Sequence, residues 1–149
     1  MINPVSVWLI DADKHDHPTI RWSLTRSPFP IDLDIFVKAE DALAALQAET
    51  IPPRVIITDT KLPGISGIDL LTQVRRSNFA GIPVVIRCTS AHEEDIAAAY
   101  AAGANAYVIK AHDLHLIERN ISGIAAFFGE LPRHITVGDD DAARSETRA

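Results

Sequence analysis

Short apolar runs alternate with helical patterns along most of the chain. Four runs are almost continuously apolar, as is typical of strands that are buried on both faces: residues 5–10, 54–58, 82–88 and 106–109. Residues 31–37 (IDLDIFV) instead alternate apolar and acidic side chains. This period of two predicts a half-exposed strand at the edge of a sheet.

The intervals between these runs carry helical patterns. We expect helices over residues 18–26, 39–49, 67–76, 91–102 and 113–128. Ser66 is the expected N-cap of the third helix, and residues 90–93 (SAHE) fit a capping box for the fourth, with Ser90 as its cap. Gly103 is expected to end the fourth helix. The last helix carries one apolar stripe, formed by Leu114, Ile117, Ile121, Ile124 and Phe128.

The regular alternation of strand and helix predicts an α/β fold. Successive βαβ units give a doubly wound (βα)5 arrangement, in which a five-stranded parallel sheet is covered by helices on both faces. Ligands of such sheets bind outside the carboxyl ends of the strands. Polar residues follow four of the predicted strands, and we expect them to converge on one cleft: Asp11, Asp59, Cys88 with Thr89, and Lys110.

Composition narrows the class of protein. With 149 residues and 47% hydrophobic residues, the chain can form one folded domain, which we place at residues 1–129, followed by a polar tail at 130–149 that we expect to be disordered. The net charge of −6 and the lack of a basic patch argue against nucleic acid as a partner. No apolar run is long enough to span a membrane, and the N-terminus lacks the pattern of a signal peptide, so a cytoplasmic location is expected. The single cysteine, Cys88, excludes an internal disulfide and a cysteine-based zinc site.

The predicted cleft would hold side chains suited to phosphoryl chemistry. Carboxylates bind Mg²⁺ through oxygen atoms, and a nearby ammonium group helps to neutralise a phosphoryl group. One aspartate can itself act as the nucleophile and form an acyl phosphate. The alternative is that these acids are solvated residues at strand ends, which are common in α/β proteins.

The segment VIITDTKLPGISGIDLL resembles the phosphoacceptor segment of bacterial response-regulator receiver domains. In that family an apolar strand is followed by an aspartate and then by proline and glycine at set offsets, which Asp59, Pro63 and Gly67 match. IPVVIRCTS and GANAYVIK resemble two later receiver signatures, and the resemblance extends over residues 5–128. It implies the flavodoxin-like receiver topology. The stretch EEDIAAAYAAGANAYVIK and the later ELP resemble small stand-alone receivers that work beside bacterial phytochromes.

The resemblance implies a role for each residue of the cleft. Asp59 matches the aspartate that takes a phosphoryl group from a sensor histidine kinase within a two-component phosphorelay, and the resemblance to phytochrome-linked receivers makes a bacteriophytochrome the candidate kinase. Lys110 matches the lysine that pairs with this phosphate, and Tyr107 matches the aromatic residue whose rotamer follows phosphorylation. Asp11 matches the first acid of the Mg²⁺-binding pair, and Asp59 would share that ion. Cys88 stands at the switch position, which usually holds serine or threonine. Such a domain signals through protein contacts and is not an enzyme.

Three departures from the family pattern weaken these expectations. Ala12 replaces the second acid of the Mg²⁺-binding pair, so we expect weak Mg²⁺ binding. Cys88 offers a thiol, which is a weak hydrogen-bond donor, in place of a hydroxyl. Ala111 replaces a proline that is common after the lysine. Asp13 as a metal ligand and Thr89 as a phosphate-binding hydroxyl are the candidate substitutes, and His15, Asp16 and His17 are expected to be solvated.

Two other functions fit parts of the sequence. A receiver fold without phosphorylation would serve as a binding or dimerisation module, which the residues Ala12 and Cys88 favour. Alternatively, LIDAD resembles the first motif of haloacid-dehalogenase-type phosphatases, in which Asp11 would be the nucleophile and Asp13 the general acid and base. The phosphatase alternative leaves the Asp59 segment unexplained, and no cap insertion is present.

The last predicted helix has more apolar residues than one buried stripe requires. Leu116, Ala125 and Phe127 lie off that stripe and are expected to be at least partly exposed in a monomer. Exposed apolar patches often mark partner surfaces, so we expect a homodimer that forms through the last helix. The alternative is that Phe127 is covered by the following Leu131-Pro132 segment.

Overall fold

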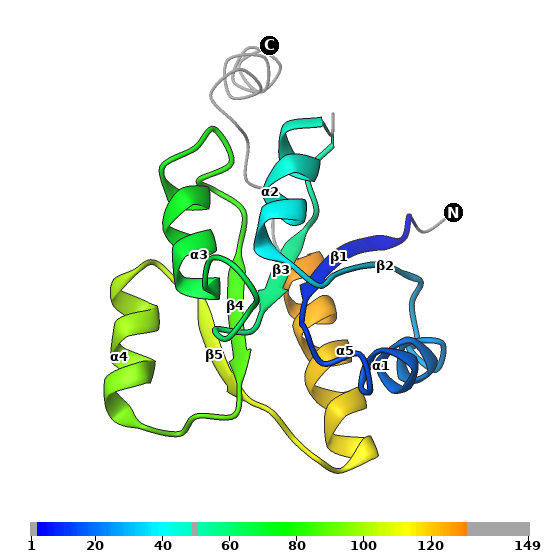
Figure 1. The fold of residues 1–149 in the computed structure, drawn as a ribbon. Helices are drawn as coiled ribbons and strands as arrows, with labels where there is room; N and C mark the ends of the chain where they lie inside the picture. Colours follow the sequence, from blue (N-terminus) through cyan, green and yellow to red (C-terminus); the bar gives the residue numbers. More distant parts are fainter. Residues whose placement is uncertain (1–2, 49–50, 131–149) are drawn as a thin grey trace.

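A computed structural model describes residues 3–48 and 51–130 of the chain. These residues form a parallel sheet with strand order β2-β1-β3-β4-β5 and helices between successive strands (Figure 1). The strands are β1 (Val5–Ile10), β2 (Ile31–Phe36), β3 (Val55–Thr58), β4 (Val84–Cys88) and β5 (Ala106–Ile109). The helices are α1 (His17–Leu24), α2 (Ala39–Ala48), α3 (Gly67–Arg75), α4 (Glu93–Ala101) and α5 (Leu114–Glu130).

The predicted doubly wound α/β fold is confirmed. Most expected elements differ from the observed ones by one or two residues at their ends. The alternating segment at residues 31–37 forms β2, which among the described strands pairs with β1 alone and is therefore an edge strand. Its burial alternates as the sequence pattern predicts, with Asp32 and Asp34 exposed.

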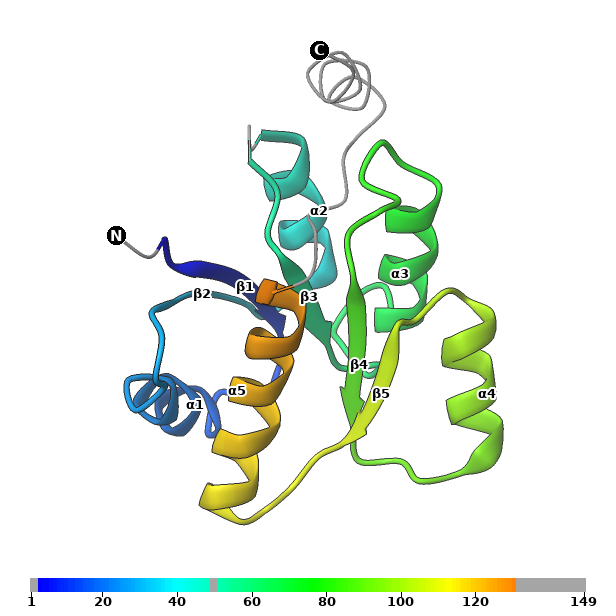
Figure 2. The same cartoon turned by 180° about the vertical axis from the view of Figure 1, so that it is seen from behind.

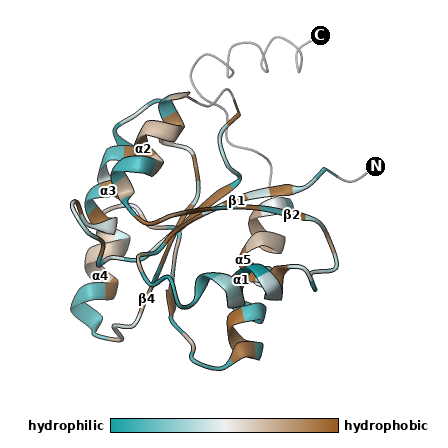
Figure 3. Cartoon of the chain, turned by 45° about the vertical axis from the view of Figure 1, so that its right-hand side comes forward, coloured by the Kyte–Doolittle hydropathy of each residue, from teal (hydrophilic) through white to brown (hydrophobic). Residues whose placement is uncertain are grey.

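The sheet is covered on both faces. Helices α1 and α5 lie on one face, and α2, α3 and α4 lie on the other (Figures 1 and 2). Alternate residues of β1 divide between the two cores: Val7 and Leu9 pack in the core with α1 and α5, whereas Trp8 and Ile10 pack in the other. The central strands are accordingly mostly hydrophobic, whereas β2 is mixed and hydrophilic residues are frequent in α1 and α4 (Figure 3).

The start of α3 brings this helix close to the end of β3. Ser66 is the N-cap, as predicted, because its hydroxyl accepts a hydrogen bond from the Asp69 backbone nitrogen at 3.0 Å. The Asp69 carboxylate in turn accepts from the Ser66 nitrogen at 3.3 Å, which completes a capping box. At Gly67 a Cβ atom would lie 1.8 Å from the backbone oxygen of Asp59, so a glycine is needed at this contact.

The predicted capping box at the start of α4 is wrong. His92, not Ser90, is the N-cap residue, and its side chain makes no capping hydrogen bond. The Ser90 hydroxyl lies two residues too early, and it instead donates to the Asp95 carboxylate and accepts from the His92 nitrogen at 3.2 Å. The end of the helix follows the prediction, since Gly103 has a φ of 108°, a conformation that favours glycine.

Helix α5 differs from its predicted pattern at two positions. Ala125 is buried, not exposed, because it lies one turn after Ile121 on the stripe that faces the sheet. Leu114, which was expected to be buried, is 39% exposed in the first turn. Leu116 and Phe127 are 46% and 60% exposed, as predicted. None of the helices within residues 3–48 and 51–130 is both long and apolar enough to cross a membrane.

The predicted tail begins at Glu130, which is the last residue of α5. The rest of that predicted tail, including the Leu131-Pro132 segment, lies outside the described residues.

Candidate functional site

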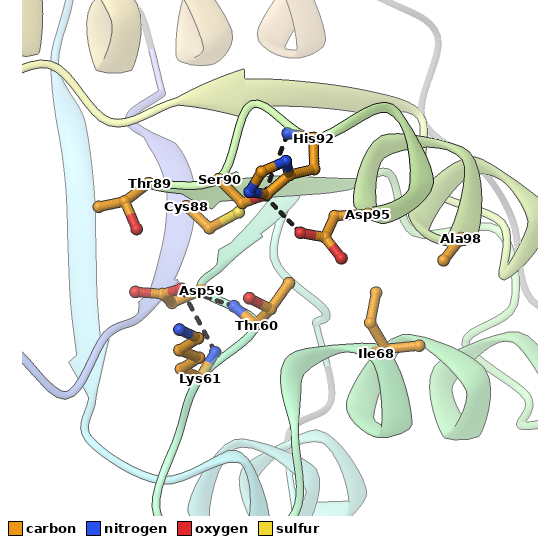
Figure 4. A pocket seen from close by; sticks show the side chains of 10 residues that line it. All are labelled: Asp59, Thr60, Lys61, Ile68, Cys88, Thr89, Ser90, His92, Asp95 and Ala98. Atoms are coloured by element: carbon orange, nitrogen blue, oxygen red, sulfur yellow. Dashed lines mark hydrogen bonds between the residues drawn. The ribbon is translucent and has the colours of Figure 1, made fainter.

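A cleft of about 480 Å³ opens at the carboxyl ends of β3 and β4 (Figure 4). The residues Asp59, Thr60 and Lys61 line one side of it, from the loop that follows β3. The segment after β4 and the first turns of α4 line the other side with Cys88, Thr89, Ser90, His92, Asp95 and Ala98. The cleft therefore lies where the rule for parallel sheets predicts a ligand site.

Backbone hydrogen bonds hold the predicted residues in place at the strand ends. The Asp11 nitrogen donates to the oxygen of Phe36 at the end of β2, and the Asp59 nitrogen donates to that of Ile10. The Lys110 nitrogen donates to the oxygen of Cys88 at 2.8 Å. Each side chain thus starts from a backbone position fixed by the neighbouring strand.

Lys110 joins the two aspartates. Its Nζ lies 2.7 Å from Oδ2 of Asp59 and 3.1 Å from Oδ2 of Asp11. The Asp11 side chain is almost wholly buried, at 1% exposure, whereas that of Asp59 is 15% exposed and faces the cleft. The prediction that these three residues converge is confirmed, and only Asp59 of the two acids is accessible to a ligand in the cleft.

The charge state of Lys110 follows from these contacts. Burial lowers the pKa of Lys110, but the hydrogen bonds that its ammonium donates to Asp59 and Asp11, together with the negative charges of these two residues, outweigh the effect of burial. The pKa is therefore raised above its ordinary value. The ammonium group stays charged at neutral pH, and the stabilisation that it provides is lost only above its ordinary titration range.

Arg87 adds a second cation that the sequence analysis did not identify. This β4 residue is 1% exposed, and its Nη1 lies 3.2 Å from Oδ2 of Asp11. Alternation along the strand places Arg87 on the same face as Val85, which packs in the core with Leu9. On this face Arg87 contacts the carboxylate of Asp11, which follows Leu9 by two residues. The sequence did hold a signal for this ion pair: an arginine within an otherwise apolar strand is expected to be buried, and buried arginines are usually paired with an acid.

His17 also contacts Asp11, although we expected this residue to be solvated. Its Nε2 lies 2.9 Å from the Asp11 backbone oxygen, and the residue is half-buried at the start of α1. The Asp11 carboxylate accepts a further hydrogen bond from the Asp13 nitrogen at 2.7 Å. His15 is exposed, as expected. The loop after β1 is thus tied to Asp11 by local contacts.

Cys88 and Tyr107 form a hydrogen-bonded pair at the back of the cleft. The Tyr107 hydroxyl donates to the Ser90 backbone oxygen at 2.8 Å, so its own oxygen can accept from the Cys88 thiol, with 2.7 Å between Sγ and the phenolic oxygen. Burial, together with the hydrogen bond between Tyr107 and Cys88, raises the pKa of Tyr107 to about 12. The phenol therefore remains protonated at physiological pH.

The two candidate substitutes lie in different surroundings. Thr89 is exposed and lines the cleft on the side formed by the segment after β4, opposite Asp59 (Figure 4). Asp13 is also exposed, and its carboxylate accepts a hydrogen bond from the His15 nitrogen at 3.1 Å. Thr89 thus lines the same cleft as Asp59, while the Asp13 carboxylate is engaged with its own loop.

The described side chains do not fit a divalent metal in this arrangement. Asp11 Oδ2 is already shared by Arg87 and Lys110, and Ala12 has no ligand atom. Oδ1 of Asp59 accepts from the Thr60 nitrogen at 2.7 Å. Within the described part of the chain, no three His, Cys, Asp or Glu side chains are grouped so that they could hold a metal ion.

Comparison with known proteins agrees with this geometry. Residues 7–122 match the response regulator receiver domain, and the chain belongs to this family. Receiver domains accept phosphoryl groups, work with sensor histidine kinases and are in general signalling domains, not enzymes. The resemblance stated from the sequence is confirmed.

Curated relatives include both long and short response regulators. The nitrate/nitrite response regulator protein NarL of Escherichia coli (strain K12) is 31% identical over 72% of this chain, and the chain spans 48% of NarL. Response regulator Rcp1 of Synechocystis sp. (strain ATCC 27184 / PCC 6803 / Kazusa) is 29% identical, and the match covers 85% of this chain and 90% of Rcp1. The chain thus corresponds to a part of NarL but to nearly all of Rcp1.

Solved structures show the same fold. The phosphorylated cyanobacterial phytochrome response regulator RcpA superposes with a TM-score of 0.78 at 26% identity, over 86% of this chain and 96% of RcpA. The Mn²⁺-bound form of Rcp1 superposes with a TM-score of 0.77 at 25% identity, over 89% of this chain and the whole of Rcp1. Stand-alone receivers associated with phytochromes are therefore among the relatives of this chain.

Proposed function

We propose that this receiver accepts a phosphoryl group on Asp59 from a sensor histidine kinase. One observation carries the proposal: of the two acids that Lys110 contacts, Asp59 is the one that lines the cleft, and its Oδ2 lies 2.7 Å from the Lys110 ammonium. A carboxylate oxygen of Asp59 attacks the phosphorus of a phosphohistidine, the phosphorus–nitrogen bond breaks, and an acyl phosphate forms. Lys110 neutralises part of the added negative charge.

Asp11 is unsuited to the nucleophilic role that the phosphatase alternative assigns to it. Its carboxylate is 1% exposed, and Arg87 and Lys110 both hold Oδ2. Attack from this oxygen would require both ion pairs to break first. The phosphatase would also use Asp13 as the general acid and base, but the Asp13 carboxylate is engaged with the His15 nitrogen.

Trapping the acyl phosphate should locate the label on Asp59. After incubation with acetyl phosphate or a phosphorylated kinase, reduction with labelled borohydride and peptide mapping should identify Asp59, and Asp59→Asn should lose the label. Asp13→Asn is the matched control, because it removes an exposed acid near the cleft and should keep the label. A label on Asp11 would instead support the phosphatase alternative.

The Cys88–Tyr107 pair is proposed as the switch. In the structure the Tyr107 hydroxyl is held by the Cys88 thiol and the Ser90 oxygen. A phosphoryl group on Asp59 would accept hydrogen bonds from donors across the cleft, where the Cys88 thiol and the exposed Thr89 hydroxyl are the available groups. It would therefore compete with Tyr107 for the Cys88 thiol. Loss of the thiol contact would free the Tyr107 ring to change its position.

The kinase partner is proposed to be a bacteriophytochrome. The support comes from Rcp1 and RcpA, since RcpA is a phytochrome response regulator and both match this chain over most of their length. Output would then pass through protein contacts in the cytoplasm. Mg²⁺ would assist the transfer only weakly, because Ala12 replaces an acid and Asp11 is already paired.

A homodimer through α5 is proposed from the exposed side chains of this helix. Phe127 is 60% exposed, and its ring lies against that of Phe128 in an edge-to-face contact with 5.0 Å between centroids. Leu116 and Leu114 are also exposed on this helix. A second copy could cover this apolar surface through two-fold contacts.

Phe127→Glu should shift this equilibrium toward the monomer. Sedimentation over a dilution series should show a dimer for the wild-type chain and a weaker one for the variant, because a charge would be buried in an apolar contact. Glu118→Gln on the same helix is the control and should leave the equilibrium unchanged. A wild-type chain that stays monomeric at high concentration would refute the dimer.

A binding module that is not phosphorylated remains the second candidate function. The observation in its favour is that Asp11 is neutralised within the protein, by Arg87 and Lys110. The trapping experiment separates the two functions. A protein that takes no label from acetyl phosphate or kinase, yet still dimerises, would be such a module.

A further inference from the structure

Arg87 is a charged residue in the core that phosphoryl acceptance does not require. Its side chain is 2% exposed, and its ion pair with Asp11 is buried. Nη2 of the same guanidinium has no hydrogen-bond partner among the described residues. Burying a cation is costly, and a half-satisfied guanidinium adds to that cost.

The charges of the site balance when Arg87 is counted. Asp11 and Asp59 carry two negative charges, and Arg87 and Lys110 carry two positive ones. Three ion pairs of 3.2 Å or less connect them: Arg87 with Asp11, Lys110 with Asp11, and Lys110 with Asp59. A divalent cation would add two positive charges to a neutral group. It would also have to compete with two cationic side chains for Oδ2 of Asp11.

We propose that Arg87 is a built-in cation of the cleft. Its guanidinium pairs with the Asp11 carboxylate that a divalent metal would need, so the resting site is neutral and binds Mg²⁺ only weakly. Arg87 affects metal binding through its ion pair with Asp11, whose carboxylate it holds in position. This role of Arg87 concerns the resting site. It does not depend on whether Asp59 is a phosphoacceptor.

The effect of Arg87 can be measured with Mn²⁺, whose free form is detected by electron paramagnetic resonance. Arg87→Gln should bind Mn²⁺ about tenfold or more tightly than the wild-type chain, because one positive charge is removed beside Asp11. Adding Ala12→Asp to Arg87→Gln should tighten binding further. Ala12→Asp alone should tighten it less, since Arg87 still holds Asp11. Arg76→Gln is the matched control, because it removes an exposed arginine at the end of α3 that is away from the cleft.

Two further measurements keep the test decisive. Arg87→Met is a second variant that suits a buried strand position if the glutamine variant folds poorly. Without any variant, Mg²⁺ added at about 1 mM should leave the unfolding midpoint of the wild-type chain unchanged, because a ligand far below its dissociation constant does not stabilise measurably. The proposal is overturned if Mg²⁺ raises that midpoint, or if folded Arg87 variants bind Mn²⁺ no better than wild type. None of these readouts depends on phosphorylation, so a failure of the proposed function would be seen separately.

Discussion

Asp11→Ala should lower the free energy of unfolding by about 3–5 kcal/mol, because it leaves the buried Arg87 guanidinium without its counter-charge. Urea denaturation, followed by circular dichroism, measures this loss. Asp13→Ala is the matched control: it removes an exposed acid two residues away and should cost within about 0.5 kcal/mol. Equal losses in the two variants would contradict the assignment of Asp11 as the centre of a buried ion-pair group.

The double variant Asp11→Ala/Arg87→Met tests the same contact in a second way. Once the arginine is gone, the loss of its partner should cost much less, so the double variant should be more stable than the sum of the single changes predicts. Additive effects would show that Asp11 and Arg87 are not energetically coupled. Lys110 remains bound to Asp59 in each variant, which helps to keep the rest of the cleft intact.

Gly67→Ala should be the second strongly destabilising change. The new Cβ would lie 1.8 Å from the Asp59 backbone oxygen, so either α3 or the end of β3 must move, at a cost of about 1–3 kcal/mol or more. The same shift should slow phosphorylation, because it displaces the backbone of Asp59 and with it the carboxylate that is to be phosphorylated. Stability is measured by urea denaturation, and phosphorylation by the rate of labelling with acetyl phosphate.

Gly123→Ala provides a matched control within α5. A Cβ at that position meets no atom within 4 Å other than its chain neighbours and the nearby backbone of its own helix, so alanine should stabilise the chain by about 0.5–1 kcal/mol through its better helix propensity. Opposite signs for the two substitutions are therefore expected. If both were destabilising to the same degree, the contact between α3 and Asp59 would not be the cause.

The sequence predicted the elements well where local physics decides them. The apolar runs and the alternating run each became a strand, because burial on one face or both leaves a direct pattern in the sequence. The convergence of Asp11, Asp59 and Lys110 was also predictable, since parallel strands end at the same edge of the sheet.

Contacts between distant elements were harder to predict. The pairing of Arg87 with Asp11 depends on sheet order and on which face each side chain takes, and the sequence run alone did not reveal it. His17 was misjudged because its contact is to a backbone oxygen. Ser90 matched a capping pattern, but its hydroxyl had a nearer partner in Asp95. Ala125 was predicted to be exposed but is buried, because the buried face of α5 is wider than the single row of apolar residues from which the stripe was predicted.

The acidic residues of β2 have a consequence for solubility. An edge strand presents unpaired backbone groups, onto which a strand of another molecule can add and begin a fibre. Here Asp32 and Asp34 are exposed along this strand. Two chains that met at this edge would bring their carboxylates together, and the repulsion should keep the sheet from growing into an aggregate.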